Sequence, residues 1–184
     1  MYRMSEKPLI TADKIRERVA TLAREIVDVY DYDILLSALT GAYMFTADLS
    51  REIANAQGAK APHKRIAFIK ASSYGDSTES SGKLQVQGLE RIPLQGKKVL
   101  MVDDIADTGT TLLGLTDMLN EAGSKEVRTC VLLNKQERRE VEIKADFVGF
   151  EIANEFVVGY GLDYGEKMRN FKDVCVLAPE VYGG

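Results

Sequence analysis

The sequence predicts an α/β protein built on a doubly wound, mostly parallel β-sheet that is flanked by helices. Short continuous apolar runs, which are typical of strands buried on both faces, recur along the chain. Between them lie segments whose apolar residues return every three or four positions, as on one face of a helix. Strands that alternate with helices are joined by right-handed crossovers, and such sheets bind ligands at the carboxyl ends of their strands.

Length and composition favour one compact domain over residues 1–184. With 45% hydrophobic and 28% charged residues, a chain of this size can bury a core without disulfides or a structural metal. The two cysteines, Cys130 and Cys175, lie in apolar runs. We therefore expect both to be reduced core residues of a cytoplasmic protein.

Charge and hydropathy exclude two broad classes of partner. The 24 basic residues are outnumbered by 28 acidic ones, which argues against an extended basic surface for nucleic acid. No apolar stretch approaches the ~18 residues of a membrane span, and charges interrupt the N-terminal segment where a signal peptide needs an apolar run. We expect no nucleic-acid partner and no membrane partner.

The first part of the chain predicts a helix, a strand and a second helix. Thr11 is a suitable N-cap for a helix whose apolar positions between Ile15 and Ile26 form one stripe. The run ILLSAL at 34–39 predicts a buried parallel strand, and Gly41 then opens a second helical pattern.

The middle of the chain predicts four further strands. RIAFIK at 65–70 is a short strand that runs into a polar loop, SSYGDSTESSG, at 72–82. The residues of KLQVQ at 83–87 alternate as in an edge strand, and KKVLMV at 97–102 predicts a buried one. A helical pattern that ends near a glycine separates this strand from EVRTCVLL at 126–133.

The densest group of polar residues follows the predicted strand VLMV, in the segment DDIADTGTT. A glycine and threonine hydroxyls at a helix N-terminus form a suitable cradle for a phosphate group. Carboxylates just before it accept hydrogen bonds from neutral hydroxyls or hold a divalent cation. The segment therefore predicts a sugar-phosphate site. Its carboxylates are Asp103, Asp104 and Asp107, and its phosphate cradle is Thr108, Gly109, Thr110 and Thr111.

Two other interpretations of this segment are weaker. Aspartate at a strand end and threonine at a helix start are ordinary turn and cap residues, but that accounts for only one or two of the seven. The Asp-Asp pair after an apolar strand also suits the acidic pocket of a response-regulator receiver. A receiver begins with that strand, whereas more than half of this fold precedes it.

VLMVDDIADTGTT resembles the phosphoribosyl pyrophosphate (PRPP) motif of type I phosphoribosyltransferases, and the chain is similar to the hypoxanthine-guanine enzymes from about Leu35 to Leu177. SSYGDSTESSG resembles the family's catalytic loop, and VLLNK and residues 146–170 match as well. The resemblance implies a sheet with a small hood made from the chain ends. It also implies Mg2+-dependent transfer of phosphoribosyl from PRPP to a 6-oxopurine in purine salvage, and a homodimer or homotetramer.

The resemblance assigns the PRPP site residue by residue. Asp103 and Asp104 would bind the ribose hydroxyls, directly or through Mg2+, and Thr108, Gly109, Thr110 and Thr111 would hold the 5'-phosphate. Asp107 would be the general base at purine N7, and its charge would stabilise an oxocarbenium-like ribose. Asp163 would hold a second Mg2+, and Arg169 would contact pyrophosphate.

The same resemblance assigns the base pocket and the lid. Lys135 would donate to the exocyclic oxygen, Phe156 would stack on the purine, and Val157 would offer backbone polar groups to the base edge. Ser73 and Tyr74 would close over the reacting centre and exclude water. On periodicity alone, however, Phe156 would be a core residue.

One position departs from the family pattern. Family members usually carry a lysine before the glycine of the pyrophosphate loop, whereas this chain has Thr40 before Gly41. That loop binds pyrophosphate through backbone amides, often with a non-prolyl cis peptide, so Thr40 would keep the backbone role and lose the charge.

Three other residues have ordinary interpretations. His63, the only histidine, follows a proline in a polar turn and is expected to be exposed. Arg138 and Arg139 lie in KQERRE, which is typical of a solvated turn.

Two alternatives to this enzyme stay open at the level of sequence. A PRPP-sensing regulatory protein without catalysis would keep the PRPP motif but would have no use for Asp107, Lys135 and Phe156. A phosphoribosyltransferase for another base would share the PRPP site but not the Lys135 and FVVGYGLDY pocket. Hypoxanthine, guanine and xanthine are not ranked, because they differ only at position 2.

Overall fold

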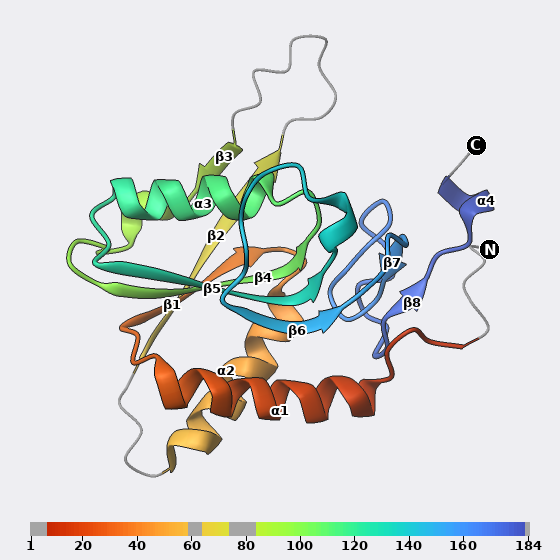
Figure 1. Ribbon diagram of the computed structural model, residues 1–184, viewed down its shortest axis with the longest axis horizontal. Coiled ribbons are helices and arrows are strands. Elements are labelled where there is room, and N and C mark those ends of the chain that lie inside the picture. The colour runs from red at the N-terminus through yellow and green to blue at the C-terminus, as the bar shows by residue number, and fades with distance from the viewer. Residues whose placement is uncertain (1–6, 59–63, 74–83, 183–184) are drawn as a thin grey trace, which may run out of the picture.

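The computed structural model describes residues 7–58, 64–73 and 84–182. A six-stranded sheet lies between helices α1 and α2 on one face and α3 on the other (Figure 1). The strands are β1 (Ile34–Leu39), β2 (Arg65–Ser73), β3 (Leu84–Gln87), β4 (Lys98–Ala106), β5 (Glu126–Asn134) and β6 (Phe147–Glu151). The helices are α1 (Ala12–Val29), α2 (Tyr43–Gln57) and α3 (Thr110–Glu121).

The sheet has the order β3-β2-β1-β4-β5-β6. All neighbouring strands are parallel except β3, which pairs antiparallel with β2 at the edge. The predicted doubly wound, mostly parallel sheet is confirmed. Because β1 and β4 are neighbours at the centre, the loops that follow them open side by side at the carboxyl edge.

Helix α1 forms where the sequence predicts it. The Thr11 hydroxyl accepts a hydrogen bond from the Lys14 amide at 3.4 Å, which caps the helix. The predicted stripe is buried against the sheet as Ile15, Val19, Leu22, Ala23 and Ile26. Packing of this stripe stabilises the helix more than its intrinsic propensity does.

Strand β4 is longer than predicted. The sequence pattern ends at Val102, but the strand continues through Asp103 and Asp104 to Ala106. Its backbone stays paired with β5, where Asp103 lies opposite Val131 and Ala106 lies opposite Asn134. The two acidic residues are therefore held by a strand rather than by a loop.

The core divides into two clusters, one on each face of the sheet. Cys130 is fully buried in the cluster under α1, as expected, and burial raises its pKa. Cys175 is only half-buried, so the expectation of a core residue is wrong there. It lies on a strand of a two-stranded sheet, which has too few neighbours to cover both faces.

A small hood stands beside the carboxyl edge of the sheet (Figure 1). Strand β7 (Val157–Val158) pairs antiparallel with β8 (Cys175–Val176), and the short helix α4 (Pro179–Tyr182) follows. From the N-terminal segment, Ile10 forms a bridge with Val174. The hood thus combines both chain ends, as the resemblance implied.

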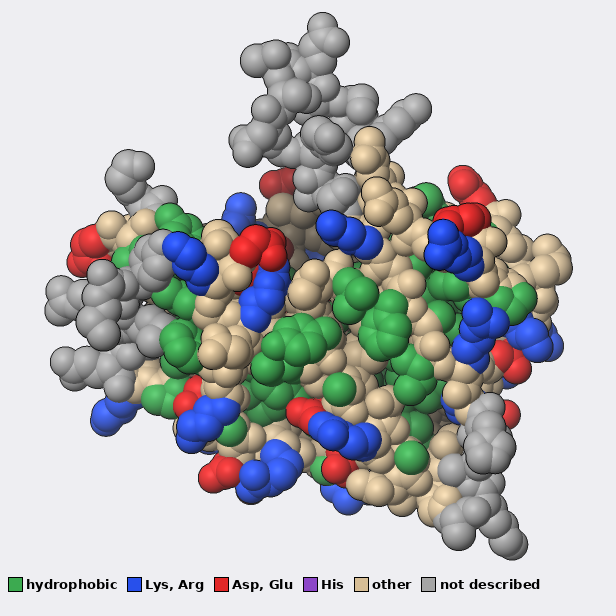
Figure 2. Space-filling view, turned by 180° about the vertical axis from the view of Figure 1, so that it is seen from behind, with side chains coloured by type: hydrophobic (Ala, Val, Ile, Leu, Met, Phe, Trp, Pro, Cys, Tyr) green, Lys and Arg blue, Asp and Glu red, His purple; other side chains and the backbone are tan. Residues whose placement is uncertain are grey.

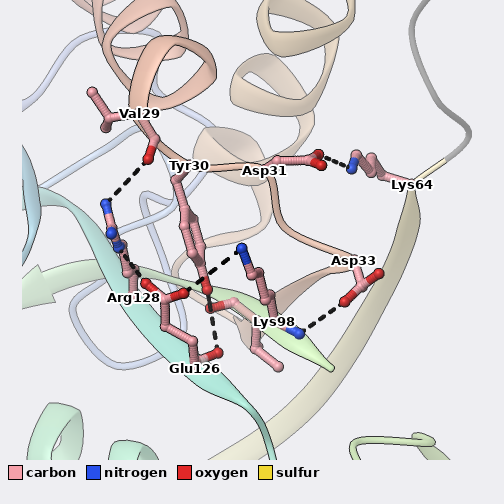
Figure 3. Close-up of polar contacts among 9 residues, drawn as sticks. Val29, Tyr30, Asp31, Asp33, Lys64, Lys98, Glu126 and Arg128 are labelled. Atoms are coloured by element: carbon pink, nitrogen blue, oxygen red, sulfur yellow. Dashed lines mark hydrogen bonds and ion pairs between the residues drawn. The ribbon is translucent and has the colours of Figure 1, made fainter. Parts of the chain in front are cut away.

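The opposite, amino edge of the sheet is closed by polar contacts (Figure 3). The Tyr30 hydroxyl at the end of α1 donates to the carbonyls of Val99 and Glu126, at 3.1 and 3.2 Å. The Arg128 guanidinium lies over the Tyr30 ring, 4.5 Å from its centroid. These contacts fix the start of β4 and β5 against α1 and leave the carboxyl edge free for ligands.

Large apolar side chains are exposed on the outer part of β2. Ile66 and Phe68 are 47% and 48% exposed and alternate with the buried Ala67 and Ile69. Figure 2 shows hydrophobic side chains gathered near the centre of the face seen from behind. Among the described residues, no helix combines the length and the hydropathy that a membrane crossing requires.

Candidate active site

Two adjoining cavities open at the carboxyl edge of the sheet. The first, of about 320 Å³, contains Thr40, Gly41, Asp103, Thr108, Gly109, Thr111 and Arg169 in its lining. The second, of about 410 Å³, is lined in part by Lys135, Arg138, Phe156 and Val157. Asp104, Asp107 and Asp163 line both. The fold therefore brings together site residues predicted from five separate segments of the sequence.

The phosphate cradle forms at the start of α3. Gly109 is the N-cap and has a φ of 88°, in the left-handed region that favours glycine. A Cβ at this position would lie 2.6 Å from the Arg139 guanidinium, so a side chain is excluded by space as well. The Thr108 and Thr110 hydroxyls share a hydrogen bond of 2.8 Å. Backbone amides and hydroxyls at this helix terminus suit an anionic phosphate.

Asp103 and Asp104 are two adjacent carboxylates within β4. The Asp104 amide donates to the Asp103 carboxylate, and the Ile105 amide donates to the Asp104 carboxylate, both at 2.9 Å. Burial raises the pKa of Asp103 well above its usual value, and the neighbouring Asp104 raises it further. Burial also raises the pKa of Asp104, although hydrogen bonds and the Arg169 charge partly offset this. Hydroxyl donors or a cation beside these carboxylates would lower the free-energy cost of ionising them in a buried site.

The loop after β1 approaches Asp104 closely. The Leu39–Thr40 peptide bond is cis, as the family pattern led us to expect. A Cβ on Gly41 would overlap the Asp104 carboxylate, so only glycine fits beside it. On the other side, a Cβ on Gly161 of the hood would overlap the Gly41 carbonyl. The loop at 40–41 is thus enclosed between β4 and the hood.

Asp107 follows β4 and faces two cations. Its Oδ2 lies 3.4 Å from the Lys135 Nζ and 3.3 Å from an Arg138 nitrogen. Its Oδ1 is buried and has no hydrogen-bond partner in the described part of the chain. Lys135 is only 5% exposed and lies at the end of β5. The predicted general base and the predicted base-pocket lysine are therefore neighbours.

Phe156 lines the second cavity instead of filling the core. Its ring is half-buried and meets the Tyr164 ring edge-on, with centroids 5.7 Å apart and planes at 86°. Val157, the next residue, is buried in β7. The ring is fixed by its neighbours and still has a face toward the cavity in which a flat heterocycle could stack.

Asp163 and Arg169 form an ion pair of 2.9 Å at the hood side of the first cavity. Arg169 also donates to the Gly161 carbonyl at 2.9 Å and pairs with Glu166 at 3.0 Å. The Glu166 amide donates to the other oxygen of Asp163 at 2.7 Å. Both predicted residues are in place, but in this structure they bind each other.

The solvated-turn interpretation is correct for Arg138, which is exposed in the turn Gln136–Arg138, and is wrong for Arg139. Arg139 is half-buried, donates to the Asn134 side chain at 2.5 Å, and lies against Gly109. Arg138 lines the second cavity beside Asp107. The charge run alone could not indicate this, because only the fold places the turn after β5 next to the turn after β4.

Ser73 ends β2, and Tyr74 and His63 lie outside the described residues. The closure of Ser73 and Tyr74 over the reacting centre and the exposure of His63 therefore stay predictions. So does the behaviour of the SSYGDSTESSG loop, most of which is also outside the described residues.

The fold and the phosphate cradle define a transferase-like α/β domain with a sugar-phosphate site. The chain belongs to the phosphoribosyl transferase domain family, whose model matches residues 10–165. It is 40% identical over 174 residues to the hypoxanthine-guanine phosphoribosyltransferase of Aquifex aeolicus, with 93% of this chain and 94% of that protein covered. The family resemblance inferred from the motifs is confirmed.

Other relatives differ in how much of their length the chain spans. A structure of Trypanosoma cruzi hypoxanthine phosphoribosyltransferase in complex with the product IMP is 39% identical, with a TM-score of 0.87 and 99% of each chain covered. The bifunctional protein TilS/HprT of Listeria monocytogenes is 37% identical over 184 residues, and the chain spans only 27% of its length.

Proposed function

We propose that this chain transfers the phosphoribosyl group of PRPP to a 6-oxopurine, hypoxanthine or guanine, as a purine salvage enzyme. The products are the nucleoside 5'-monophosphate and pyrophosphate. The observation that carries the proposal is Asp107, a carboxylate beside Lys135 that lines both the phosphate cavity and the cavity of Lys135 and Phe156. A carboxylate at that junction can accept a proton from a base while a sugar phosphate lies beside it.

In the first cavity, the 5'-phosphate and the pyrophosphate of PRPP bind at two separate places. The 5'-phosphate binds the amides and hydroxyls of residues 108–111 at the start of α3. The ribose hydroxyls donate to Asp103 and Asp104, which adds hydrogen bonds that favour the charged form of these buried carboxylates. The pyrophosphate lies between the loop at 40–41 and Arg169.

The base fits the second cavity. Phe156 supplies a stacking face, Lys135 donates to the 6-oxo group, and backbone groups near Val157 read the base edge. A lysine has three donors and no acceptor, so it suits an oxo group and opposes the amino group of adenine. The xanthine, guanine and hypoxanthine preference depends on position 2, which Lys135 does not contact in this arrangement.

The reaction forms a bond between N9 of the purine and C1' of the ribose and breaks the bond from C1' to the pyrophosphate oxygen. The electron pair of the broken bond leaves with pyrophosphate. The proton at N7 passes to Asp107 as the base becomes bonded at N9. The Asp107 charge also stabilises the positive ribose that develops between the two bonds.

The acidic residues fit Mg2+ only together with substrate oxygens. Among the described residues no three acidic, histidine or cysteine side chains are grouped as a metal site. Mg2+ usually takes one or two carboxylates, with phosphate and water oxygens completing its shell. Asp103 and Asp104 would hold one ion at the ribose and Asp163 a second at the pyrophosphate. When bound, Mg2+ would neutralise charge on the leaving group.

Asp107→Asn tests this assignment. The substitution is nearly isosteric and removes the proton acceptor and its charge, so kcat should fall by about 10²- to 10⁴-fold. PRPP affinity, measured by calorimetry, should stay within about twofold, since the PRPP contacts lie on other residues. Asp117→Asn, on the exposed side of α3, is the matched control and should leave both quantities unchanged. A nearly fully active Asp107→Asn enzyme would exclude Asp107 as the base.

Assays of nucleotide formation and of PRPP binding separate the enzyme from a PRPP-sensing regulatory protein. A sensor would bind PRPP with the residues of the first cavity and form no nucleotide with any purine. The affinity of a sensor for PRPP would also be unchanged by substitution of the base-pocket residues Lys135 and Phe156.

A further inference from the structure

Asp107 is held through one oxygen only. Both Lys135 and Arg138 approach Oδ2, at 3.4 and 3.3 Å, while the buried Oδ1 has no partner in the described part of the chain. Each carboxylate oxygen has two lone pairs, so a single oxygen can accept hydrogen bonds from both cations. Because Oδ2 alone binds these two side chains, the position of the carboxylate depends on them.

The turn that carries Arg138 is tied to the site at both ends. At one end, the Lys135 amide donates to the Ala106 carbonyl at 3.0 Å, directly before Asp107. At the other end, the Glu140 amide donates to the Thr108 carbonyl at 2.9 Å, directly after it. The residues between them begin as a 3-10 turn, Gln136–Arg138. These two backbone bonds set the position of Arg138 relative to Asp107.

Lys135 has two tasks that compete. In this structure it binds Asp107, whereas in the proposed reaction it donates to the 6-oxo group of the base. When a purine attracts the ammonium group, the Asp107 carboxylate loses part of its support and gains freedom to rotate. Arg138 can keep Oδ2 in place during that exchange, because a guanidinium is always charged and has several fixed donors.

We propose that Arg138 is a positioning residue for Asp107: it retains the carboxylate while Lys135 turns to the base, so that the carboxylate stays directed at the N7 proton. This inference rests on the proposed role of Asp107 as the base. Arg138 is half-exposed, with 46% of its side chain accessible, so its removal should not disturb the core. Loss of the Arg138 side chain should lower kcat, because a misplaced catalytic group slows the reaction even when the substrates bind.

Arg138→Met tests the inference, with Arg138→Lys as the conservative variant. With PRPP and hypoxanthine both saturating, kcat of Arg138→Met should fall by about 10- to 100-fold, while KM for PRPP and Tm stay unchanged. Arg138→Lys should recover most of kcat, since it restores a cation at Oδ2. Arg91→Met is the matched control, because Arg91 is also paired with a carboxylate but is remote from both cavities. An Arg138→Met enzyme with unchanged kcat would overturn the inference.

A double variant shows whether Arg138 acts through Asp107. Asp107→Asn combined with Arg138→Met should be no slower than Asp107→Asn alone, since there is no base left to position. Multiplied losses would overturn the inference and indicate that Arg138 contacts a substrate itself. If Asp107→Asn alone is nearly fully active, the proposed base is wrong, and the positioning role falls with it. The three rates therefore distinguish the two failures.

Discussion

We expect discrimination against adenine to depend on Lys135. It is 5% exposed at the end of β5, beside Asp107. A buried site built to donate to a substrate oxygen rejects an analogue that presents a donor, because both groups then lack partners. Lys135→Met should lower kcat/KM for hypoxanthine and narrow its advantage over adenine. Steady-state rates with both bases test this, and an unchanged preference in Lys135→Met would exclude the lysine as the discriminating group.

Asp103 should make the ligand-free protein less stable as pH rises. Burial raises the pKa of this carboxyl in the folded protein, whereas the unfolded chain keeps the usual value. Below the pKa of Asp103 in the unfolded chain, the carboxyl is protonated in both the folded and the unfolded state, so its burial does not lower the free energy of unfolding. Between the two pKa values the unfolded chain ionises first, so the free energy of unfolding falls as pH rises.

Asp103→Asn removes that cost and still accepts the Asp104 amide. In EDTA at pH 7.5 its Tm should exceed that of wild type by a few degrees, since 1 kcal/mol shifts the Tm of such a domain by about 2–4 °C. At about pH 4 the difference should disappear, because wild type is then protonated too. Calorimetric melts at both pH values test this; a lower Tm for Asp103→Asn at pH 7.5 would contradict it.

At the residue scale, sequence alone predicts a phosphate cradle and an acidic pair, because turns and helix caps need only one or two of the seven clustered polar residues. It could not locate Phe156 or Lys135 without the family resemblance, since an aromatic before two valines fits a core equally well. It missed Arg138, whose partner Asp107 lies 31 positions earlier in the chain.

At the scale of elements, the hood packs closely against the loop at 40–41. Gly161 has a φ of 103°, and a Cβ there would overlap the Gly41 carbonyl. Its amide donates to the Arg169 carbonyl, and its carbonyl accepts from the Arg169 side chain, both at 2.9 Å. The position of Arg169 in the site therefore depends on close approach of the hood backbone.

Gly161→Ala should displace the hood from the loop at 40–41. We expect KM for PRPP to rise by about 10-fold or more, because small misplacements of substrate-positioning groups are costly. Gly165→Ala is the matched control: its φ is also positive, 57°, but a Cβ there meets nothing within 4 Å. Gly165→Ala introduces less backbone strain, because its φ lies in the left-handed region that alanine can adopt, and Tm reports that difference. KM for PRPP reports the displacement of the loop at 40–41. Equal KM values for the two variants would contradict the proposed contact.

The elements that the sequence predicted best are those with local signals. Helix α1 has a cap and an apolar stripe, and β1 has a continuous apolar run. The sequence pattern does not predict strand β6, which is short, contains a glycine and lies within the family match at 146–170. The backbone carbonyls of Val148 and Gly149 in β6 accept hydrogen bonds from the Arg18 side chain of α1, at 2.7 and 2.8 Å. No local pattern predicts a contact across 130 residues.

At the scale of the whole molecule, the two edges of the sheet have different roles. The amino edge is closed by Tyr30 and its polar neighbours (Figure 3), while the carboxyl edge collects residues from β1, β4, β5 and the hood. The exposed Ile66 and Phe68 on β2 leave apolar surface that a second copy could cover. The expected homodimer or homotetramer stays a prediction.

We expect the protein to bind PRPP and a 6-oxopurine in its two adjoining cavities and to transfer the phosphoribosyl group from one to the other. The most direct test is one set of steady-state assays with PRPP and hypoxanthine, guanine, xanthine or adenine, each with Mg2+ and with EDTA. We predict that hypoxanthine or guanine gives its nucleotide and pyrophosphate in equal amounts, that EDTA abolishes the reaction, and that kcat/KM for adenine is lower by about 10⁴ or more. Comparable efficiency with adenine, or no nucleotide from any base, would contradict the account.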